Sequence, residues 1–329
     1  MTTMLKTWTA NRAFIRQYST AFKPDIKLLA KLRKETEVSM SKAKEALTKA
    51  DNNYQSALTW LQQDAIASGT KKASKVGTRI AGEGLISTAL INNRCSVIEL
   101  NCETDFVSRN GMFKNLAQQV AATSLFLHEP VDKERCVENM QLDTLARAPM
   151  LPTAEGTYRD ETVHESIVQA IGKLGENIIL RRASVVSQGL SASYVHGGDG
   201  KTGKIAGVAV LNVAGETNPE QKKAMANVAV QVARQVVGFA PRFAQTEDVP
   251  TDELNSQADQ NMFLKEAVLS QQDYLMNPSL TVGEFVDQSA KSVGLEGATV
   301  VDFIRWEVGE NIEKRADDFA NEVIQAAKN

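Results

Sequence analysis

The side chains best suited to specific recognition are gathered in one run, Asn101-Cys102-Glu103-Thr104-Asp105-Phe106-Val107-Ser108-Arg109-Asn110. The pattern predicts the end of a strand, an acidic-aromatic loop, and a helix that begins near Gly111. A phenylalanine on such a loop has two interpretations. It packs beneath its own loop as a small satellite core, or it protrudes as an anchor for a pocket on a partner protein. Residue type alone leaves both open.

A second candidate is the glycine-rich run Gly197-Gly198-Asp199-Gly200-Lys201-Thr202-Gly203, which satisfies the GxGxxG pattern of phosphate-binding turns. Such a turn has to follow a strand and open a helix, whose first N–H groups hold the phosphate. Here the run leads into Ile205–Val213, an apolar segment of strand length. Val195 also stands where a phosphate loop ending in Gly-Lys-Thr needs a glycine. The run therefore predicts a hairpin tip.

Other reactive groups are few. The sequence has three cysteines and three histidines, namely Cys95, Cys102, Cys136, His128, His164 and His196. An odd cysteine count without a CxxC pair fits a reducing compartment, and these residues offer too few ligands for a usual zinc site. No GxSxG, HExxH or DFG-type motif occurs. The sequence predicts no catalytic residues, no metal and no cofactor.

The composition is that of an ordinary globular protein of two or three compact parts. The chain has 329 residues, 43% hydrophobic and 23% charged, and a formal net charge of −3. A nucleic-acid-binding domain is usually basic, because neutralising phosphates dominates its affinity. No apolar run reaches the roughly 20 residues that span a bilayer. We therefore expect neither a nucleic-acid nor a membrane partner.

The N-terminal segment is basic and rich in hydroxyl residues. Lys6, Arg12, Arg16 and Lys23 precede the first acidic residue, Asp25. This composition is typical of a mitochondrial presequence, which we place at residues 1–18. A disordered basic tail is the alternative.

Helical periodicity dominates the next part of the chain. Apolar residues at spacings of three and one predict three short helices within residues 25–66, and Ser39 is a plausible cap for the second. Residues 67–79 contain the run Ser68–Gly77, polar, basic and bounded by glycines. We predict a linker there.

Two later stretches predict the same order of elements. Gly84–Ile91 and Cys95–Asn101 predict a hairpin, followed by a helix over Phe113–Leu127. Tyr194–His196 and Lys204–Val213 predict a second hairpin, followed by a helix over Pro219–Val237. This internal repeat indicates two related α/β subdomains, residues 80–190 and 191–300. The end of the chain, residues 301–329, predicts a C-terminal helical module.

Several of these segments resemble the elongation factor Ts family. The loop around Thr104–Val107 resembles the family's Thr-Asp-Phe-Val signature. Further similar segments occur in the family's order, namely Leu32-Arg33-Lys34-Glu35-Thr36, Lys44-Glu45-Ala46-Leu47, Gly172-Lys173-Leu174-Gly175-Glu176-Asn177-Ile178, Tyr194-Val195-His196-Gly197 and Phe303-Ile304-Arg305-Trp306-Glu307-Val308-Gly309-Glu310. The resemblance covers essentially everything after residue 25.

This resemblance implies an α+β fold: an N-terminal three-helix domain similar to ubiquitin-associated domains, then two repeated α/β subdomains and the C-terminal module. It implies a non-enzymatic guanine nucleotide exchange factor for elongation factor Tu in the mitochondrial matrix, with no direct nucleotide binding. The implied partner-binding residues are Arg33, Met40, Thr104, Asp105, Phe106, Val107, Leu174, Gly175 and His196. Asp105 and Phe106 would enter the partner beside its switch and Mg²⁺ site.

The chain departs from the family at two places. Thr36-Glu37 stands where the family often has Thr-Gly, which predicts a different first turn between helices. Bacterial members insert a coiled coil before the C-terminal module, and Val249–Thr281 is too short for it. The shorter form resembles the mitochondrial branch.

Two other functions compete with this interpretation. One is an enzyme that uses the glycine-rich run as a phosphate site. The other is a ubiquitin-binding adaptor built on the three-helix domain, although Glu37-Val38-Ser39-Met40 stands where such domains commonly have a Met-Gly-aromatic loop. Neither explains the loop at Asp105 and Phe106.

Overall fold

The computed structural model describes residues 23–36, 38–129, 136–152 and 161–312. The predicted presequence, the turn residue Glu37 and residues 313–329 of the predicted helical module lie outside these ranges. Contacts along the chain divide it into two compact parts at the Ala65/Ile66 boundary. We call residues 23–65 the three-helix unit and residues 66–312 the sheet unit.

The three-helix unit follows the predicted periodicity. Its helices are α1 (Ile26–Thr36), α2 (Met40–Lys49) and the first part of α3 (Tyr54–Val76). Ser39 caps α2, its hydroxyl accepting a hydrogen bond from the N–H of Lys42. The core is small and wholly apolar, consisting of Leu29, Leu32, Ala43, Ala46, Leu47, Ala57 and Leu61.

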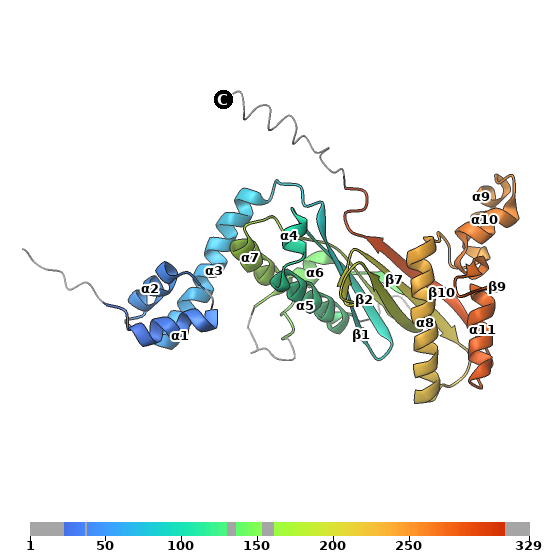
Figure 1. The fold of residues 1–329 in the computed structure, drawn as a ribbon, viewed down its shortest axis with the longest axis horizontal. Helices are drawn as coiled ribbons and strands as arrows, with labels where there is room; N and C mark the ends of the chain where they lie inside the picture. The colour runs from blue at the N-terminus through green and yellow to red at the C-terminus, as the bar shows by residue number, and fades with distance from the viewer. Residues whose placement is uncertain (1–22, 37, 130–135, 153–160, 313–329) are drawn as a thin grey trace, which may run out of the picture. The chain divides into compact units, whose positions relative to one another are not determined.

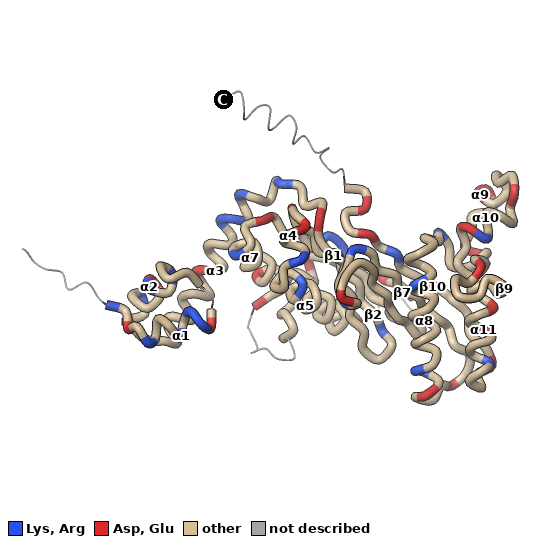
Figure 2. Tube along the Cα trace, viewed as in Figure 1, with Lys and Arg blue, Asp and Glu red and all other residues tan. Residues whose placement is uncertain are grey.

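The predicted linker is wrong for most of its length, because α3 continues without a break to Val76. Gly69 acts as a site of close approach rather than as a flexible joint. A Cβ atom there would lie 2.4 Å from the backbone oxygen of Val168. The following residues Ala73 and Val76 pack against the core of the sheet unit. The lysines of this part of α3 are among the blue segments in Figure 2. Packing against a neighbouring helix thus overrides the linker-like composition.

The sheet unit contains two antiparallel sheets and a separate pair of short strands. The larger sheet has the order β3-β4-β2-β1-β6, the smaller has the order β10-β7-β5, and β8 pairs with β9. The strands are β1 (Glu83–Ile91), β2 (Arg94–Cys102), β3 (Val137–Asn139), β4 (Ile179–Val186), β5 (Leu190–His196), β6 (Thr202–Gly203), β7 (Ile205–Val213), β8 (Asp273–Tyr274), β9 (Asn277–Thr281) and β10 (Ala298–Glu307).

Helices cover the outer faces of both sheets (Figure 1). The helices of the sheet unit are α4 (Asp105–Ser108), α5 (Gly111–Leu127), α6 (Leu142–Arg147), α7 (Val163–Leu174), α8 (Pro219–Phe239), α9 (Thr251–Asn255), α10 (Gln260–Ala267) and α11 (Val282–Ser292), with 3₁₀ turns at Thr246–Asp248 and Leu269–Gln271. Of these, α5 packs on the larger sheet, and α8 and α11 pack on the smaller sheet. No helix in the described part of the chain combines the length and the apolar character needed to cross a membrane.

Alternating side chains of the strands belong to different cores. In β1, Leu85 faces the core shared with α5 and α7, whereas Ile86 faces a core between the two sheets. In β7, Leu211 packs with α8 and α11, whereas Val208 faces the core between the sheets. Burial of both faces explains why these strands are almost continuously apolar.

Both predicted hairpins are confirmed, as β1 pairs with β2 and β5 pairs with β7. The repeat is longer than the sequence indicates. After α7 the chain forms β4, which pairs with β2, and after α11 it forms β10, which pairs with β7. Both copies therefore share a hairpin, a long helix, a second helix and a third strand, with different short elements inserted between them.

This longer repeat corrects the predicted helical module at residues 301–307, which belong to strand β10. The strand completes the second sheet just as β4 completes the first. The segment after it is held by Glu99 of β2, a fully buried side chain. The Glu99 carboxylate pairs with Arg181 at 3.1 Å and accepts the N–H of Gly309 at 2.8 Å. Long-range pairing decides the structure of this segment.

Candidate functional site

The loop after β2 forms a single capped turn of helix, α4. The Thr104 hydroxyl accepts a hydrogen bond from the N–H of Val107, which makes Thr104 the cap. Val107 and Ser108 are buried, whereas 81% of Phe106 is exposed. Successive residues of a helix point about 100° apart, so one short turn can bury two side chains and present a third. Phe106 therefore protrudes from the turn and does not pack beneath its own loop as a satellite core.

Asp105 lies at the start of the same turn. Its carboxylate forms an ion pair with Arg109 at 2.8 Å, and the pair is open to solvent, since the side chain of Asp105 is 40% exposed and that of Arg109 is 75% exposed. An exposed pair of this type contributes little stability. Asp105 can therefore exchange Arg109 for another partner with little loss of stability.

The loop is tied to the end of α7, the second segment of the predicted site. Leu174 is the last residue of α7, and Gly175 ends the helix with a φ of 80°. The next residue, Glu176, accepts hydrogen bonds from the N–H groups of Glu103 and Thr104, at 3.1 and 3.0 Å. The Thr104 hydroxyl donates to the same carboxylate at 2.6 Å. Segments about 70 residues apart thus meet at one carboxylate, which sequence reasoning did not assign to the site.

His196 is the exposed last residue of β5. Its Nδ1 atom lies 3.4 Å from the Tyr194 hydroxyl, and its backbone oxygen accepts the N–H of Lys204 at 2.9 Å. The Lys204 ammonium in turn donates to Glu83 at 2.9 Å and approaches the Ser108 hydroxyl at 3.5 Å. Lys204 therefore connects the backbone of His196 with the base of α4.

The remaining predicted residues, Arg33 and Met40, belong to the three-helix unit. Arg33 is exposed on α1, and Met40, the first residue of α2, is 43% exposed. Both are accessible on the surface of that unit.

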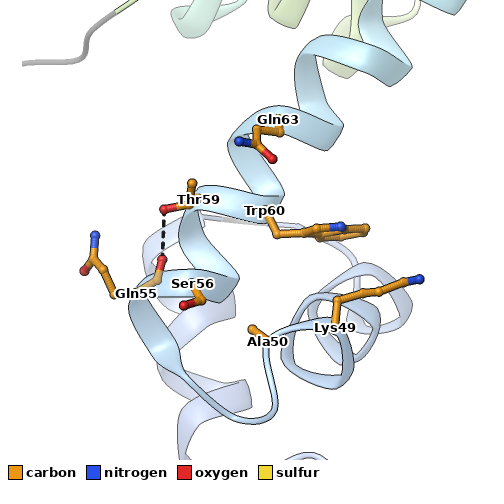
Figure 3. Close-up of a pocket in the computed structure, with 7 residues that line it drawn as sticks. All are labelled: Lys49, Ala50, Gln55, Ser56, Thr59, Trp60 and Gln63. Atoms are coloured by element: carbon orange, nitrogen blue, oxygen red, sulfur yellow. Dashed lines mark hydrogen bonds between the residues drawn. The ribbon is translucent and has the colours of Figure 1, made fainter.

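The three-helix unit also carries a shallow hollow of about 350 Å³, shown in Figure 3. Its lining comes from the end of α2 and the start of α3, namely Lys49, Ala50, Gln55, Ser56, Thr59, Trp60 and Gln63. Met40 lies at the opposite end of α2. The hollow is therefore separate from the residues predicted to bind a partner.

The cysteines of the sheet unit are poor nucleophiles. Burial raises the pKa of both Cys95 and Cys102 to about 12, and burial also raises the pKa of Cys136. Only a thiolate attacks or binds a metal readily. Within the described ranges, no cluster of three or more His, Cys, Asp or Glu side chains is arranged to hold a metal ion.

The glycine-rich run forms a hairpin tip closed by its own aspartate. Asp199 accepts hydrogen bonds from the N–H groups of Lys201 and Thr202 and from the Thr202 hydroxyl, at 3.0, 2.7 and 3.0 Å. The next long element is strand β7. The turn therefore lacks the following helix that a phosphate loop requires, and an acidic side chain occupies its backbone donors.

Comparison with known proteins identifies the family. The family model described as elongation factor TS matches residues 103–261 and 259–310. Mitochondrial elongation factor Ts of Coprinopsis cinerea is 36% identical over 91% of this chain and 96% of its own length. The human mitochondrial protein is 36% identical over 87% of this chain and 84% of its own length, and elongation factor Ts of Lactiplantibacillus plantarum is 32% identical over 90% and 96%. Because the family model matches most of the chain and these relatives match it over nearly its full length, the chain belongs to the elongation factor Ts family of translation elongation factors and is similar to its mitochondrial members.

Proposed function

We propose that this chain is a guanine nucleotide exchange factor for elongation factor Tu in the mitochondrial matrix. It acts without catalysing a chemical reaction, by binding the partner GTPase in a form that holds GDP weakly. The observation that carries the proposal is the exposure of Phe106, 81%, on a turn whose next two residues, Val107 and Ser108, are buried.

An exposed phenylalanine on a fixed turn is suited to act as a wedge. Burying a ring of this size in a partner's pocket contributes about 2 kcal/mol. Since α4 is capped by Thr104 and anchored by Val107, little freedom is lost when the ring is bound. Low entropy cost is the general advantage of such preorganised contacts.

Asp105 would act beside the ring by exchanging its exposed pair with Arg109 for groups of the partner. In a GTPase, Mg²⁺ carries much of the positive charge that faces the phosphates. Displacing side chains that support the Mg²⁺ shell weakens GDP binding. By linkage, GDP then weakens binding of the factor to the same degree.

The other contacts in this proposal surround the wedge or come from the three-helix unit. Thr104 and Val107 hold the loop, while Leu174 and Gly175 approach the partner's phosphate loop. His196 makes a second contact, and Arg33 and Met40 face the GTPase domain. The exposed or half-buried positions of Arg33, Met40, Leu174, Gly175 and His196 are compatible with these roles.

The test is the release of fluorescent GDP from mitochondrial elongation factor Tu, with the full-length chain as the added factor. Phe106→Ala is expected to weaken partner binding by about 2 kcal/mol or more, the usual scale of a hot-spot residue. The half-saturating concentration of factor should then rise about 30-fold.

Phe126→Ala is the matched control, because Phe126 is a second phenylalanine of the sheet unit with 75% exposure. It should leave release unchanged. If the Phe106→Ala variant accelerated GDP release as well as the unmodified chain does, Phe106 would not act as the wedge. Failure of the unmodified chain to accelerate release would refute the exchange function.

A further inference from the structure

The helical turn that presents Phe106 is too short to be stable on its own. α4 has four residues, whereas an isolated helix needs roughly 12–15 residues to be even marginally stable in water. Its orientation must therefore be imposed by contacts from elsewhere in the fold.

Glu176 supplies the most direct of these contacts. Its carboxylate receives the N–H groups of Glu103 and Thr104 together with the Thr104 hydroxyl. The same hydroxyl accepts the N–H of Val107, at 3.4 Å, inside α4. In the described part of the chain, Glu176 takes part in no ion pair within 4.0 Å, so its charge is directed at the loop. Hydrogen bonds to a charged acceptor are about twice as strong as neutral ones.

A second carboxylate works in the reverse direction. Glu103, before the turn, accepts the N–H of Asn177 at 2.7 Å. It also pairs with Arg79 at 3.4 Å, and the backbone oxygen of Arg79 accepts the side-chain amide of Asn177 at 2.8 Å. Each segment thus provides a carboxylate that accepts hydrogen bonds from backbone N–H groups of the other segment. This crossed arrangement fixes the two segments more firmly than one hydrogen bond could.

We propose that Glu176 is a positioning residue for exchange, which sets the orientation of Phe106 before the partner arrives. The inference rests on the proposed function. It also implies that Phe106 and the Leu174-Gly175 end of α7 form one rigid contact unit, because Glu176 directly follows Gly175 in the chain. The spacing between the two contact points is then fixed in the free protein.

The first experiment compares Glu176→Gln with Glu165→Gln in the full-length chain. Glu165 is the matched control: it lies at the other end of α7, and its carboxylate also accepts the N–H and hydroxyl of a threonine, Thr162, at 2.8 and 3.0 Å. Glu176→Gln should raise the half-saturating concentration for GDP release about tenfold and leave the rate at saturation within about twofold, because the bound loop is the same. Glu165→Gln should change neither.

A double variant tests whether Glu176 acts through the ring. In a Phe106→Ala background, Glu176→Gln should raise the half-saturating concentration for GDP release by less than about twofold, because the effects of residues that act as a unit are not additive. A tenfold rise in the half-saturating concentration in both backgrounds would overturn the proposal. So would a half-saturating concentration that Glu176→Gln alone leaves unchanged.

Thr104 provides a second variant that keeps Glu176 intact. Thr104→Val removes the hydroxyl at nearly constant shape and should raise the half-saturating concentration as Glu176→Gln does. Thr104→Ser keeps a hydroxyl and should have a half-saturating concentration near that of wild type. Hydrogen exchange of the Glu103 and Thr104 amides in the free protein separates this inference from the proposed function. Faster exchange in Glu176→Gln supports positioning even if Phe106 proves irrelevant to GDP release, and unchanged exchange overturns it.

Discussion

At the scale of single residues, the site depends on side-chain direction more than on residue type. Phe106 is the largest apolar residue of its turn and is exposed, whereas Ser108 is polar and only 4% exposed. The hydroxyl of Ser108 donates to the backbone oxygen of Asp105 at 2.9 Å, which compensates its burial. Burial preference by type therefore predicts this turn wrongly.

Gly175 permits a test at this scale. Its φ is 80°, and a Cβ atom there would meet no atom within 4 Å. Backbone strain is then the only cost of a side chain, and Gly175→Ala should lower the free energy of unfolding by about 1 kcal/mol. Gly175→Asn should lower the free energy of unfolding by less, because asparagine tolerates this conformation. Urea unfolding monitored by circular dichroism measures both.

The control for this prediction is Gly238→Ala in helix α8. A Cβ atom at Gly238 also meets nothing within 4 Å, but its φ is ordinary. Alanine is the better helix former, so this variant should match or exceed wild-type stability. A loss equal to that of Gly175→Ala would contradict the explanation by φ.

At the scale of elements, each hairpin serves a different purpose although the two belong to one repeat. The turn of the first joins β1 and β2 through Asn92 and Asn93, both with positive φ. The tip of the second extends to the other sheet, where Ser87 of β1 pairs with Thr202. The acid Asp199 closes this tip, and we expect it to make the tip sensitive to pH.

The direction of this effect follows from the pKa of Asp199. Slight desolvation by neighbouring atoms opposes its ionisation. Hydrogen bonds from the N–H groups of Thr202 and Lys201 and from the Thr202 hydroxyl, with Lys114 nearby, outweigh this effect and lower the pKa. A lowered carboxyl pKa stabilises the fold above about pH 4, and this stabilisation is lost as the pH falls through the folded-state value.

Asp199→Asn should therefore lower the Tm at pH 7 by about 2 °C, a small change because the side chain is exposed. The difference from wild type should shrink below about pH 4. Thermal unfolding followed by circular dichroism between pH 7 and pH 3 gives the comparison. A difference that grows toward acid pH would show that the carboxylate is not the stabilising form.

At the scale of the whole molecule, the two units have cores of very different size. Seven buried residues form the core of the three-helix unit, whereas three clusters fill the sheet unit. Small cores give marginal stability. We therefore expect the three-helix unit to open locally while the sheet unit stays folded.

Leu47→Ala tests this expectation, since Leu47 is fully buried in the small core. Such a truncation costs about 2–5 kcal/mol, and amide hydrogen exchange should accelerate in residues 26–61 alone. Leu211→Ala, at a fully buried position between β7 and α8, should instead accelerate exchange in the sheet unit. Equal acceleration throughout the chain in both variants would mean that the two units unfold together.

Local sequence patterns were sufficient to predict the helices of the three-helix unit, both hairpins, the helices that follow them and the loop that begins at Thr104. These features depend on local periodicity, capping and turn residues, which each segment carries within itself. The family, too, followed from short local motifs such as the segment from Gly172 to Ile178.

Features that depend on contacts between distant segments could not be predicted from local patterns. The linker-like run from Ser68 became helix because Gly69 allows close approach to Val168, and residues 301–307 became strand because β7 offered an open edge. Likewise, Glu176 belongs to the site only because the fold brings it to Thr104. The physical reason is the same in each case: packing and pairing energies come from contacts across the chain, and local composition carries no record of which segments will meet.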